Sequence, residues 1–534
     1  MDGQTETVVA QSMTSVKALA LFIAAAACAS AHVGSPDIYL DGQAGPYKLF
    51  ITVRPPTVIP GVAEIEVRAQ SAGVKQLTVV PVPLNRAGTK LAPVPDTLKV
   101  SPQDPQEFTG SLWIMTPGSW QVRISASGTD GTGKMAVPVP AYALSTKKMG
   151  GGLGAVLLTL TILLSAGMVL IVGASVREGQ LQPGVRPESA SVRRSYEAMI
   201  KAGAVVGLVL AFGFWWWSSA ERDYREKIYK PLNMTASLNG GVLTLKLSDP
   251  GWLNLPGRNL GRLSPTVFVR TIDDLVPDHN HLMHLYAIRE PRLDEVYHLH
   301  PEQTAAGVFR LELPGMKPGS YRLYADIVHA NGFPETPVGQ VTIPGGFTGR
   351  PLEGDDASGS AVPWQNAPAS NATFRLPDGY AMEWLKPATP IRVREGNLFR
   401  FRLLDSSGKP AGNMRYYMGM LGHAAFVKTD GTRFAHIHPT GSVSMASLVL
   451  AENQLPGSKK QQKDMAASGM EMSGMDMPGM DMSEMHMGTG AAPAGLPSEV
   501  TFPYGFPAPG RYRVFVQMKH DRTVETGAFD VDVK

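Results

Sequence analysis

Eight of the chain's twelve histidines fall into two groups that share an early histidine, a His-x-His pair and a late histidine. The groups are His284, His298, His300 and His329, and His423, His436, His438 and His520. His279 and His281 precede the first group, have no counterpart in the second, and are not expected to be ligands. Because imidazole is the commonest protein ligand for transition metals, the pattern predicts two equivalent metal sites.

A tight hairpin is predicted to position the second group. Asp430-Gly431 is a strong signal for a two-residue hairpin loop. Counting outward from that loop sets His423 opposite His438 and Ala425 opposite His436. Cross-strand partners and alternate residues share one face of a sheet, so the three imidazoles are expected to point the same way.

The first group has one more residue between its histidines, which a three-residue loop at 291–293 absorbs. His284 then falls opposite His300, and Tyr286 opposite His298. Opposed Cβ atoms stand about 5 Å apart, which lets two imidazoles reach one ion at about 2 Å per bond. The late histidines, His329 and His520, are each expected to supply a further ligand from another strand.

Methionine favours copper over zinc at these sites. Imidazole alone does not choose among zinc, copper and nickel, but thioether sulfur is a soft ligand that prefers Cu(I). Met418, Met420 and Met518 lie beside the second group, and Met283 beside the first. A run of nine methionines and one histidine predicts a Cu(I) trap: Met465, Met470, Met472, Met475, Met477, Met480, Met482, Met485, His486 and Met487. Zinc remains the alternative metal.

The histidine groups belong to an internal repeat, 231–346 and 371–534, joined by a linker at 347–370. Pro-Gly-x-Tyr-Arg begins a strand eleven residues before the late histidine in both copies, at Pro318 and Pro509. His300 to His329 spans 29 residues and His438 to His520 spans 82, so the second copy carries an insertion of about 53 residues. This insertion, about 446–497, contains the methionine run and is predicted to be disordered.

The N-terminus is predicted to be a signal peptide, residues 1–31. Cleavage after Ala31 would remove the only cysteine, Cys28, and leave His32 as the first residue. An N-terminal histidine resembles the start of the CopC family of periplasmic copper carriers. That family needs a second histidine in the same domain, and residues 33–146 contain none.

Two further apolar segments, 149–176 and 202–220, are long enough to span a bilayer. The loop between them, 177–201, is basic, as a cytoplasmic loop should be. Two spans return the chain to its starting side, so an export signal would put both flanking regions outside the cytoplasmic membrane. Gly203 and Gly207 are expected to let the two helices pack closely.

Short alternating strands separated by turns predict a β-sandwich over residues 32–146. The chain is rich in glycine and proline (56 and 43 residues), which favours strands and turns over helical bundles. The predicted fold is therefore mainly β, with three Ig-like sandwiches and two transmembrane helices. A net charge of +3 gives no sign of a nucleic-acid partner.

The strand pattern and the Pro-Gly-x-Tyr motifs resemble bacterial extracytoplasmic Ig-like domains of the FixH/YtkA-like kind, which are small membrane-tethered sandwiches. The Met-Asp-Met-Pro-Gly-Met segment at 475–480 resembles the runs of periplasmic copper-resistance proteins. Both resemblances imply copper handling at the cell envelope.

The expected function is copper binding at the periplasmic or extracellular face of the cytoplasmic membrane, for tolerance, storage or delivery. A cuproenzyme or copper transporter would be the partner. A metalloenzyme with an open histidine site is the first alternative, although neither copy shows a carboxylate base at a motif-like spacing. A structural or assembly subunit with metal-stiffened sandwiches is the second.

Overall fold

The computed structural model describes residues 36–84, 92–182, 184–252, 270–367, 372–387, 389–455 and 495–534. The chain is mainly β, built from antiparallel sheets, with two long apolar helices. It divides into two compact units, Tyr142–Tyr229 and the remainder, Met1–Ala141 with Lys230–Lys534. The predicted signal peptide, His32, and the methionine run with His486 lie outside the described residues.

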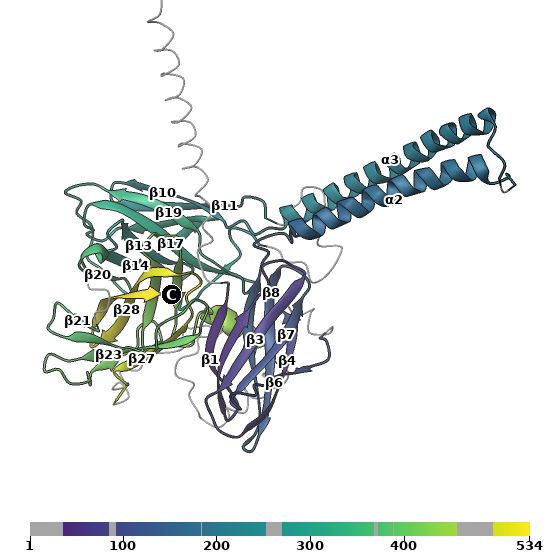
Figure 1. Ribbon diagram of the computed structural model, residues 1–534. Coiled ribbons are helices and arrows are strands. Elements are labelled where there is room, and N and C mark those ends of the chain that lie inside the picture. The colour runs from purple at the N-terminus through teal and green to yellow at the C-terminus, as the bar shows by residue number, and fades with distance from the viewer. Residues whose placement is uncertain are drawn as a thin grey trace, which may run out of the picture. The chain divides into compact units, whose positions relative to one another are not determined.

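The larger unit begins with two antiparallel sheets (Figure 1). In β3 the alternation of apolar and charged residues buries Ala63, Ile65 and Val67 and leaves Glu64 exposed, as a half-buried strand requires. The first sheet contains β1 (Ile38–Ala44), β2 (Tyr47–Arg54), β3 (Gly61–Ala69), β7 (Glu107–Ile114) and β6 (Lys99–Val100). The second contains β5 (Asp96–Thr97), β4 (Val74–Pro83), β8 (Gly118–Gly128) and β9 (Gly131–Ala141).

The smaller unit consists largely of two helices, α2 (Gly151–Glu178) and α3 (Ser189–Glu226), drawn side by side in Figure 1. Each is long and apolar enough to cross a membrane, so the two apolar helices predicted from the sequence are confirmed. However, α3 begins much earlier than expected, and most of the predicted loop 177–201 is helical. No glycine or proline interrupts the chain between Pro187 and Gly203, so nothing stops a helix there.

The helices of the smaller unit meet at Gly173 of α2. A Cβ at Gly173 would collide with Met199, and the Ser195 hydroxyl donates to the Gly173 carbonyl oxygen at 2.6 Å. No atom lies within 4 Å of a Cβ built on Gly203 or Gly207, so the predicted contact through that pair is wrong. The contact at Gly173 instead involves the part of α3 that precedes the apolar segment first assigned to it.

The first repeat contributes two sheets. One has β10 (Asn233–Asn239), β11 (Val242–Ser248), β16 (Val308–Glu312) and β15 (Glu302–Ala305). The other has β12 (Leu275–Val276), β17 (Gly319–His329), β13 (His284–Glu290), β14 (Glu295–Leu299) and β20 (Ala357–Ser360), with β18 (Pro334–Glu335) and β19 (Val338–Ile343) also paired to β17. The predicted linker 347–370 is therefore structured in part, because β20 pairs with the edge of β14 and the short helix η3 (Trp364–Asn366) follows it.

The second repeat has the same two-sheet plan. One sheet has β21 (Thr373–Arg375), β22 (Ala381–Leu385), β23 (Asn397–Leu404) and β27 (Glu499–Tyr504). The other has β24 (Met414–Arg415), β28 (Gly510–His520), β25 (His423–Lys428), β26 (Phe434–Ile437) and β29 (Thr523–Val533). The late histidine pairs with the short strand in each copy, His329 with Leu275 and His520 with Met414, so β12, β13, β14 and β17 correspond to β24, β25, β26 and β28.

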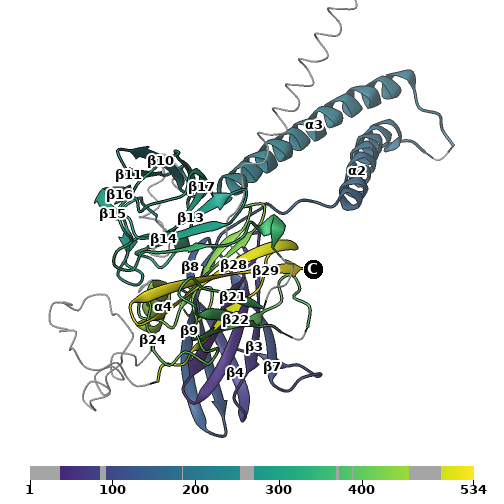
Figure 2. The same cartoon turned by 90° about the vertical axis from the view of Figure 1, so that its left-hand side faces the viewer.

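The predicted insertion starts with a helix, α4 (Met445–Glu452). Ser444 caps it by accepting a hydrogen bond from the Ser447 amide. Figure 2 shows α4 beside β9, and Ala451 is fully buried against Leu84 and Ala136. Residues 445–452 are almost entirely apolar, so they fold where the low-complexity sequence after them was expected not to.

The matching sheets of the two repeats face each other across a shared apolar cluster. The cluster combines equivalent positions from both copies, such as Ile288 with Val427 and Tyr324 with Phe515. The rings of Tyr324 and Phe434 stack at 4.3 Å between centroids. The histidine-bearing strands are thus brought together by the interface between the repeats.

Candidate metal centre

The two hairpins have the predicted registers. Ala425 pairs with His436 and Tyr286 with His298, as counting from the loops required. The imidazole centroids of His423 and His438 lie 5.1 Å apart, and those of His284 and His300 lie 5.0 Å apart. The local geometry expected from the Asp-Gly turn and the three-residue loop is confirmed.

The two hairpin groups were expected to form separate sites, and the structure joins them into one cluster. The centroid of His436 lies 5.3 Å from that of His284 and 5.5 Å from that of His298, across the boundary between the repeats. His298 and His423 are 6.1 Å apart across the same boundary. We call His284, His298 and His300 the first triad, and His423, His436 and His438 the second triad.

In the first triad, each histidine uses one nitrogen to hold its orientation. His284 Nε2 donates to the Asp278 carbonyl oxygen (2.9 Å), and His298 Nδ1 donates to Gln517 Oε1 (2.9 Å). These partners only accept, so the facing nitrogens, His284 Nδ1 and His298 Nε2, both carry lone pairs at 3.1 Å. His300 Nδ1 donates to Asp356 (3.0 Å), and its buried Nε2 has no hydrogen-bond partner.

The second triad repeats this arrangement. His423 Nε2 donates to the Tyr417 carbonyl oxygen (3.2 Å), and His436 Nδ1 donates to the Asp326 carboxylate (3.0 Å). With Asp326 ionised, the lone pairs of His423 Nδ1 and His436 Nε2 face each other at 3.2 Å. His438 Nδ1 donates to the Val443 carbonyl oxygen (3.2 Å), and its Nε2 is buried without a partner.

These distances fit a bound metal ion. Two nitrogens bonded to one ion at about 2.0–2.1 Å with a tetrahedral angle stand about 3.3 Å apart. One nitrogen from each of His284, His298 and His300 lies within 4.8 Å of the others. Metal-ligating histidines usually donate their other ring nitrogen to a carbonyl or carboxylate, and all six triad histidines bond an oxygen acceptor in this way.

Burial keeps the triad imidazoles neutral, which is the form that binds metal. Removal from water, helped by the neighbouring histidines, lowers the pKa of His284, His298, His423 and His436 well below its usual range. The same cause lowers the pKa of His438 to about 3. With no proton available between the facing nitrogens, a cation is the group that complements them.

His279 and His281 have counterparts after all, in Met418 and Met420. Asp278 and His281 form an isolated antiparallel β-bridge, and Tyr417 and Met420 form the same bridge in the second repeat. His279 and Met418, at the equivalent position inside each turn, both have a φ of 50°. The sequence obscured this match because the counterparts are methionines. His279 Nε2 is buried without a partner, and His279 groups with His423 and His438 of the other repeat.

Two residues that orient the triads were not expected from the sequence, namely Asp326 and Gln517. Each lies three residues before the late histidine of its repeat and contacts the opposite repeat, Asp326 touching His436 and Gln517 touching His298. Burial, followed by the charge of Asp278, raises the pKa of Asp326 to about 8. Their equal spacing from His329 and His520 was the only available signal.

The late histidines lie outside both triads, contrary to expectation. His329 Nδ1 lies 2.6 Å from Asp274 and its Nε2 3.1 Å from Glu335, which also binds Arg270 at 2.7 Å. Two carboxylates therefore hold His329, and Arg270 occupies the place where a further cation would balance them. Asp326, which faces the triads, and His329 stand three residues apart on β17, so their side chains leave opposite faces of the sheet and His329 cannot reach the ions that the hairpin would bind.

His520 occupies the matching position in the second repeat. Its Nε2 lies 3.0 Å from Asp378 and 3.6 Å from Glu525, and its ring stacks on Tyr380 at 4.0 Å. Asp378, His520 and Glu525 form a third group with metal-like spacing, although Asp378 is exposed. Met283 and Met518, which neighbour the histidines in sequence, are fully buried in the apolar cores of their own repeats.

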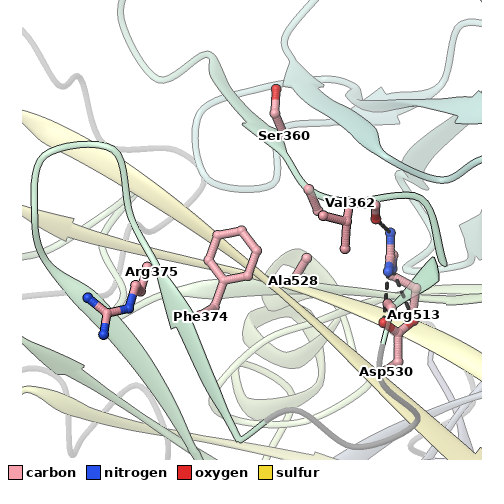
Figure 3. Close-up of a pocket in the computed structure, with 9 residues that line it drawn as sticks. Ser360, Val362, Phe374, Arg375, Arg513, Ala528 and Asp530 are labelled. Atoms are coloured by element: carbon pink, nitrogen blue, oxygen red, sulfur yellow. Dashed lines mark hydrogen bonds and ion pairs between the residues drawn. The ribbon is translucent and has the colours of Figure 1, made fainter.

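A pocket of about 440 Å³ lies elsewhere between the repeats (Figure 3). Ser360 and Val362 come from the first repeat, and Phe374 and Ala528 from the second. Its two buried charged residues, Arg513 and Asp530, bind each other at 2.7 Å, and Arg513 also donates to the carbonyl oxygens of Leu293 and Val362. The buried charges of the pocket are therefore already paired, Arg375 in its lining is exposed, and the histidine cluster is the candidate functional site.

Comparisons with known proteins do not name a function. A family model described as a domain of unknown function, DUF8832, matches residues 260–342 and 477–534, which belong to both repeats. The chain has no match among the curated proteins.

Solved structures give only distant likenesses. A tetra-tandem repeat from the extending region of a large adhesion protein is 7% identical, with 93% of this chain and 82% of that chain covered and a TM-score of 0.15. A putative membrane-anchored protein from Corynebacterium diphtheriae is 11% identical, with 93% and 94% covered and a TM-score of 0.13. Elastase-activated alpha-2-macroglobulin from Escherichia coli is 10% identical, with 92% and 35% covered and a TM-score of 0.17. At these scores the likeness carries no functional inference.

Proposed function

We propose that this chain is a membrane-anchored, extracytoplasmic copper-binding protein that serves copper tolerance, storage or delivery. Its three β regions would be Ig-like, FixH/YtkA-like sandwiches on the periplasmic or extracellular side of the cytoplasmic membrane, held there by α2 and α3. The observation that carries the proposal is the pair of opposed lone pairs, one in each triad, at 3.1 and 3.2 Å. Buried acceptors that face each other without a proton are costly unless a cation lies between them.

Copper is preferred to zinc because of the methionines. The run from Met465 to Met487 supplies thioether sulfur, which binds Cu(I) and has little affinity for harder cations. Met418 and Met420 occupy the turn beside the second hairpin. A chain with both imidazole and thioether ligands suits copper in either oxidation state, and a cuproenzyme or copper transporter would exchange ions with it.

The test is elemental analysis of the full chain in detergent after exposure to copper and zinc together. The methionine run would be silenced by serine substitution of its nine methionines and His486, so that the remaining metal reports on the triads. The double variant H300Q/H438Q removes the one unpartnered Nε2 atom of each triad. We expect it to lower copper affinity by at least about 10–100-fold, the loss that even an outer-shell change typically causes.

The matched control is H329Q/H520Q, which makes the same chemical change at the two late histidines outside the triads. This control is expected to retain its copper. Equal copper in the two double variants, or tightly bound zinc that neither pair of substitutions affects, would refute the proposal.

A further inference from the structure

The turns before the two hairpins are equivalent in backbone and different in chemistry. Asp278-His279-Asn280-His281 corresponds to Tyr417-Met418-Gly419-Met420. In each turn the first residue offers its carbonyl oxygen to the leading histidine of its own hairpin, His284 or His423. The second residue has a φ of 50° in both, and the third also lies in the left-handed region (68° and 77°).

Each turn reaches the triad of the other repeat. The His279 ring lies 5.0 Å from the centroids of His423 and His438, closer than the 6.1 Å that separates it from His284 of its own repeat. In the opposite direction, the Tyr417 hydroxyl donates to the Asp355 carbonyl oxygen at 2.7 Å and lies 3.4 Å from His298 Nδ1. The crossing is therefore reciprocal, and the equivalence of the two turns predicts that Met418 faces the first triad as His279 faces the second.

The charge around the two triads also differs, and the second triad is the more negative one. Behind the second triad, Asp326 contacts His436 and Thr336, and no lysine or arginine in the described ranges forms an ion pair with it. The equivalent position behind the first triad is the neutral Gln517. The first triad does have Asp356 on His300, but Arg350 neutralises that carboxylate at 2.6 Å.

We propose that the two triads form a two-ion centre in which the sites prefer different oxidation states of copper. The second triad, with His279, is an all-nitrogen site backed by an uncompensated carboxylate and takes Cu(II). The first triad, with the Met418 thioether, is a softer and less negative site that takes Cu(I). The inference rests on the proposed copper-binding function and adds the division of labour between the sites.

Two physical effects support this division. Thioether sulfur favours the cuprous ion, whereas imidazole and carboxylate favour the cupric ion. A bound cation favours the ionised form of Asp326, and this buried carboxylate, with no other cationic partner among the described residues, stabilises an ion of higher charge more, since the attraction grows in proportion to that charge. Asp326, His279 and Met418 differ from their counterparts in the direction that separates the two preferences, whereas His281 stacks on His300 of its own repeat at 3.9 Å and pairs with Asp355 at 3.4 Å.

The test uses Ag(I) as a redox-inert substitute for Cu(I), together with Cu(II), on the full chain in detergent with the methionine run and His486 replaced by serine. Wild-type triads are expected to hold one Ag(I) and one Cu(II) at once. In M418H the first site becomes all-nitrogen, so Ag(I) is expected to fall towards zero while bound Cu(II) rises towards two. H279M is expected to shift the second site towards Ag(I).

Y416H is the matched control, because it adds an imidazole to the same turn at a residue that is 45% exposed. It should leave the one-to-one stoichiometry unchanged. If wild type and M418H take up both ions in the same proportions, the division of labour is wrong while copper binding stands. If wild type binds neither ion, the proposed function itself fails.

Discussion

Each triad histidine spends one ring nitrogen on its orientation and keeps the other for a ligand. The cost of this arrangement in the metal-free chain is that buried acceptors face each other, at about 1–3 kcal/mol for each unsatisfied group. His329 contrasts with them, because two carboxylates and Arg270 satisfy its surroundings completely. Neither residue type nor burial separates the two roles, since the triad histidines and His329 are all buried imidazoles.

The structural role of His329 has a pH signature. Burial opposes its charge, but the hydrogen bonds with Asp274 and Glu335 outweigh burial and raise the pKa of His329 above its usual 6.5. A raised folded-state pKa contributes stability that is fully present below pH 6.5 and is lost as the pH rises through the folded value. We expect H329Q to unfold about 1–3 kcal/mol more easily than wild type at pH 5.5, with a smaller difference at pH 9.

Thermal unfolding of both proteins at the two pH values measures this difference, and elemental analysis of the same samples measures copper. H329Q should retain the copper of the triads. A stability difference that does not change with pH would contradict the charged role of His329. Copper lost in H329Q would show that this histidine is a ligand.

Among the elements, the hairpins were predictable and their partnership was not. Asp430-Gly431 fixes the register of β25 and β26 over a few residues, so local rules were sufficient. The contact between Asp326 and His436 spans 110 residues, and no local pattern encodes it. The late histidines were misassigned for the same reason, because the strand was correct but tertiary packing decides which of its two faces meets the other repeat.

The turn at Gly431 belongs both to a local element and to the interface between the repeats, since it closes the second hairpin and contacts the first repeat. Gly431 has a φ of +71°, and its carbonyl oxygen accepts from the Tyr324 hydroxyl at 3.2 Å. G431V should cost about 1–2 kcal/mol in backbone strain and also displace Glu290 and Arg322 of the first repeat, which an added Cβ would meet. We therefore expect lower thermal stability and weaker copper binding.

G408V is the control for this variant. Gly408 has a similar φ of +80°, and no atom lies within 4 Å of an added Cβ. G408V should therefore introduce the backbone strain without displacing any neighbouring side chain. Both variants are compared by thermal unfolding and by copper titration. Copper binding that weakens equally in the two would mean that the turn does not support the centre.

At the scale of the whole molecule, the histidine cluster lies where the two repeats meet. Bound ions are therefore expected to make the two repeats unfold together. Ligands that bind only the native state stabilise it by about 2.7 kcal/mol at a concentration of 100 Kd. We expect copper to raise the midpoint of thermal unfolding of the β regions in detergent and a chelator to reverse the rise. H300Q/H438Q should respond to neither, and a copper-induced rise in that variant would place the stabilising ion elsewhere.

The relation between the repeats has a further consequence. When two identical subunits form an isologous interface, every substitution appears on both sides, so such a dimer cannot place Asp on one half and Gln on the other. Here the reciprocal contacts of Asp326 and Gln517 lie within one polypeptide. Because the two repeats are covalently joined in one chain, a substitution in one repeat does not have to appear in the other. Each repeat can therefore diverge while the other maintains the shared interface.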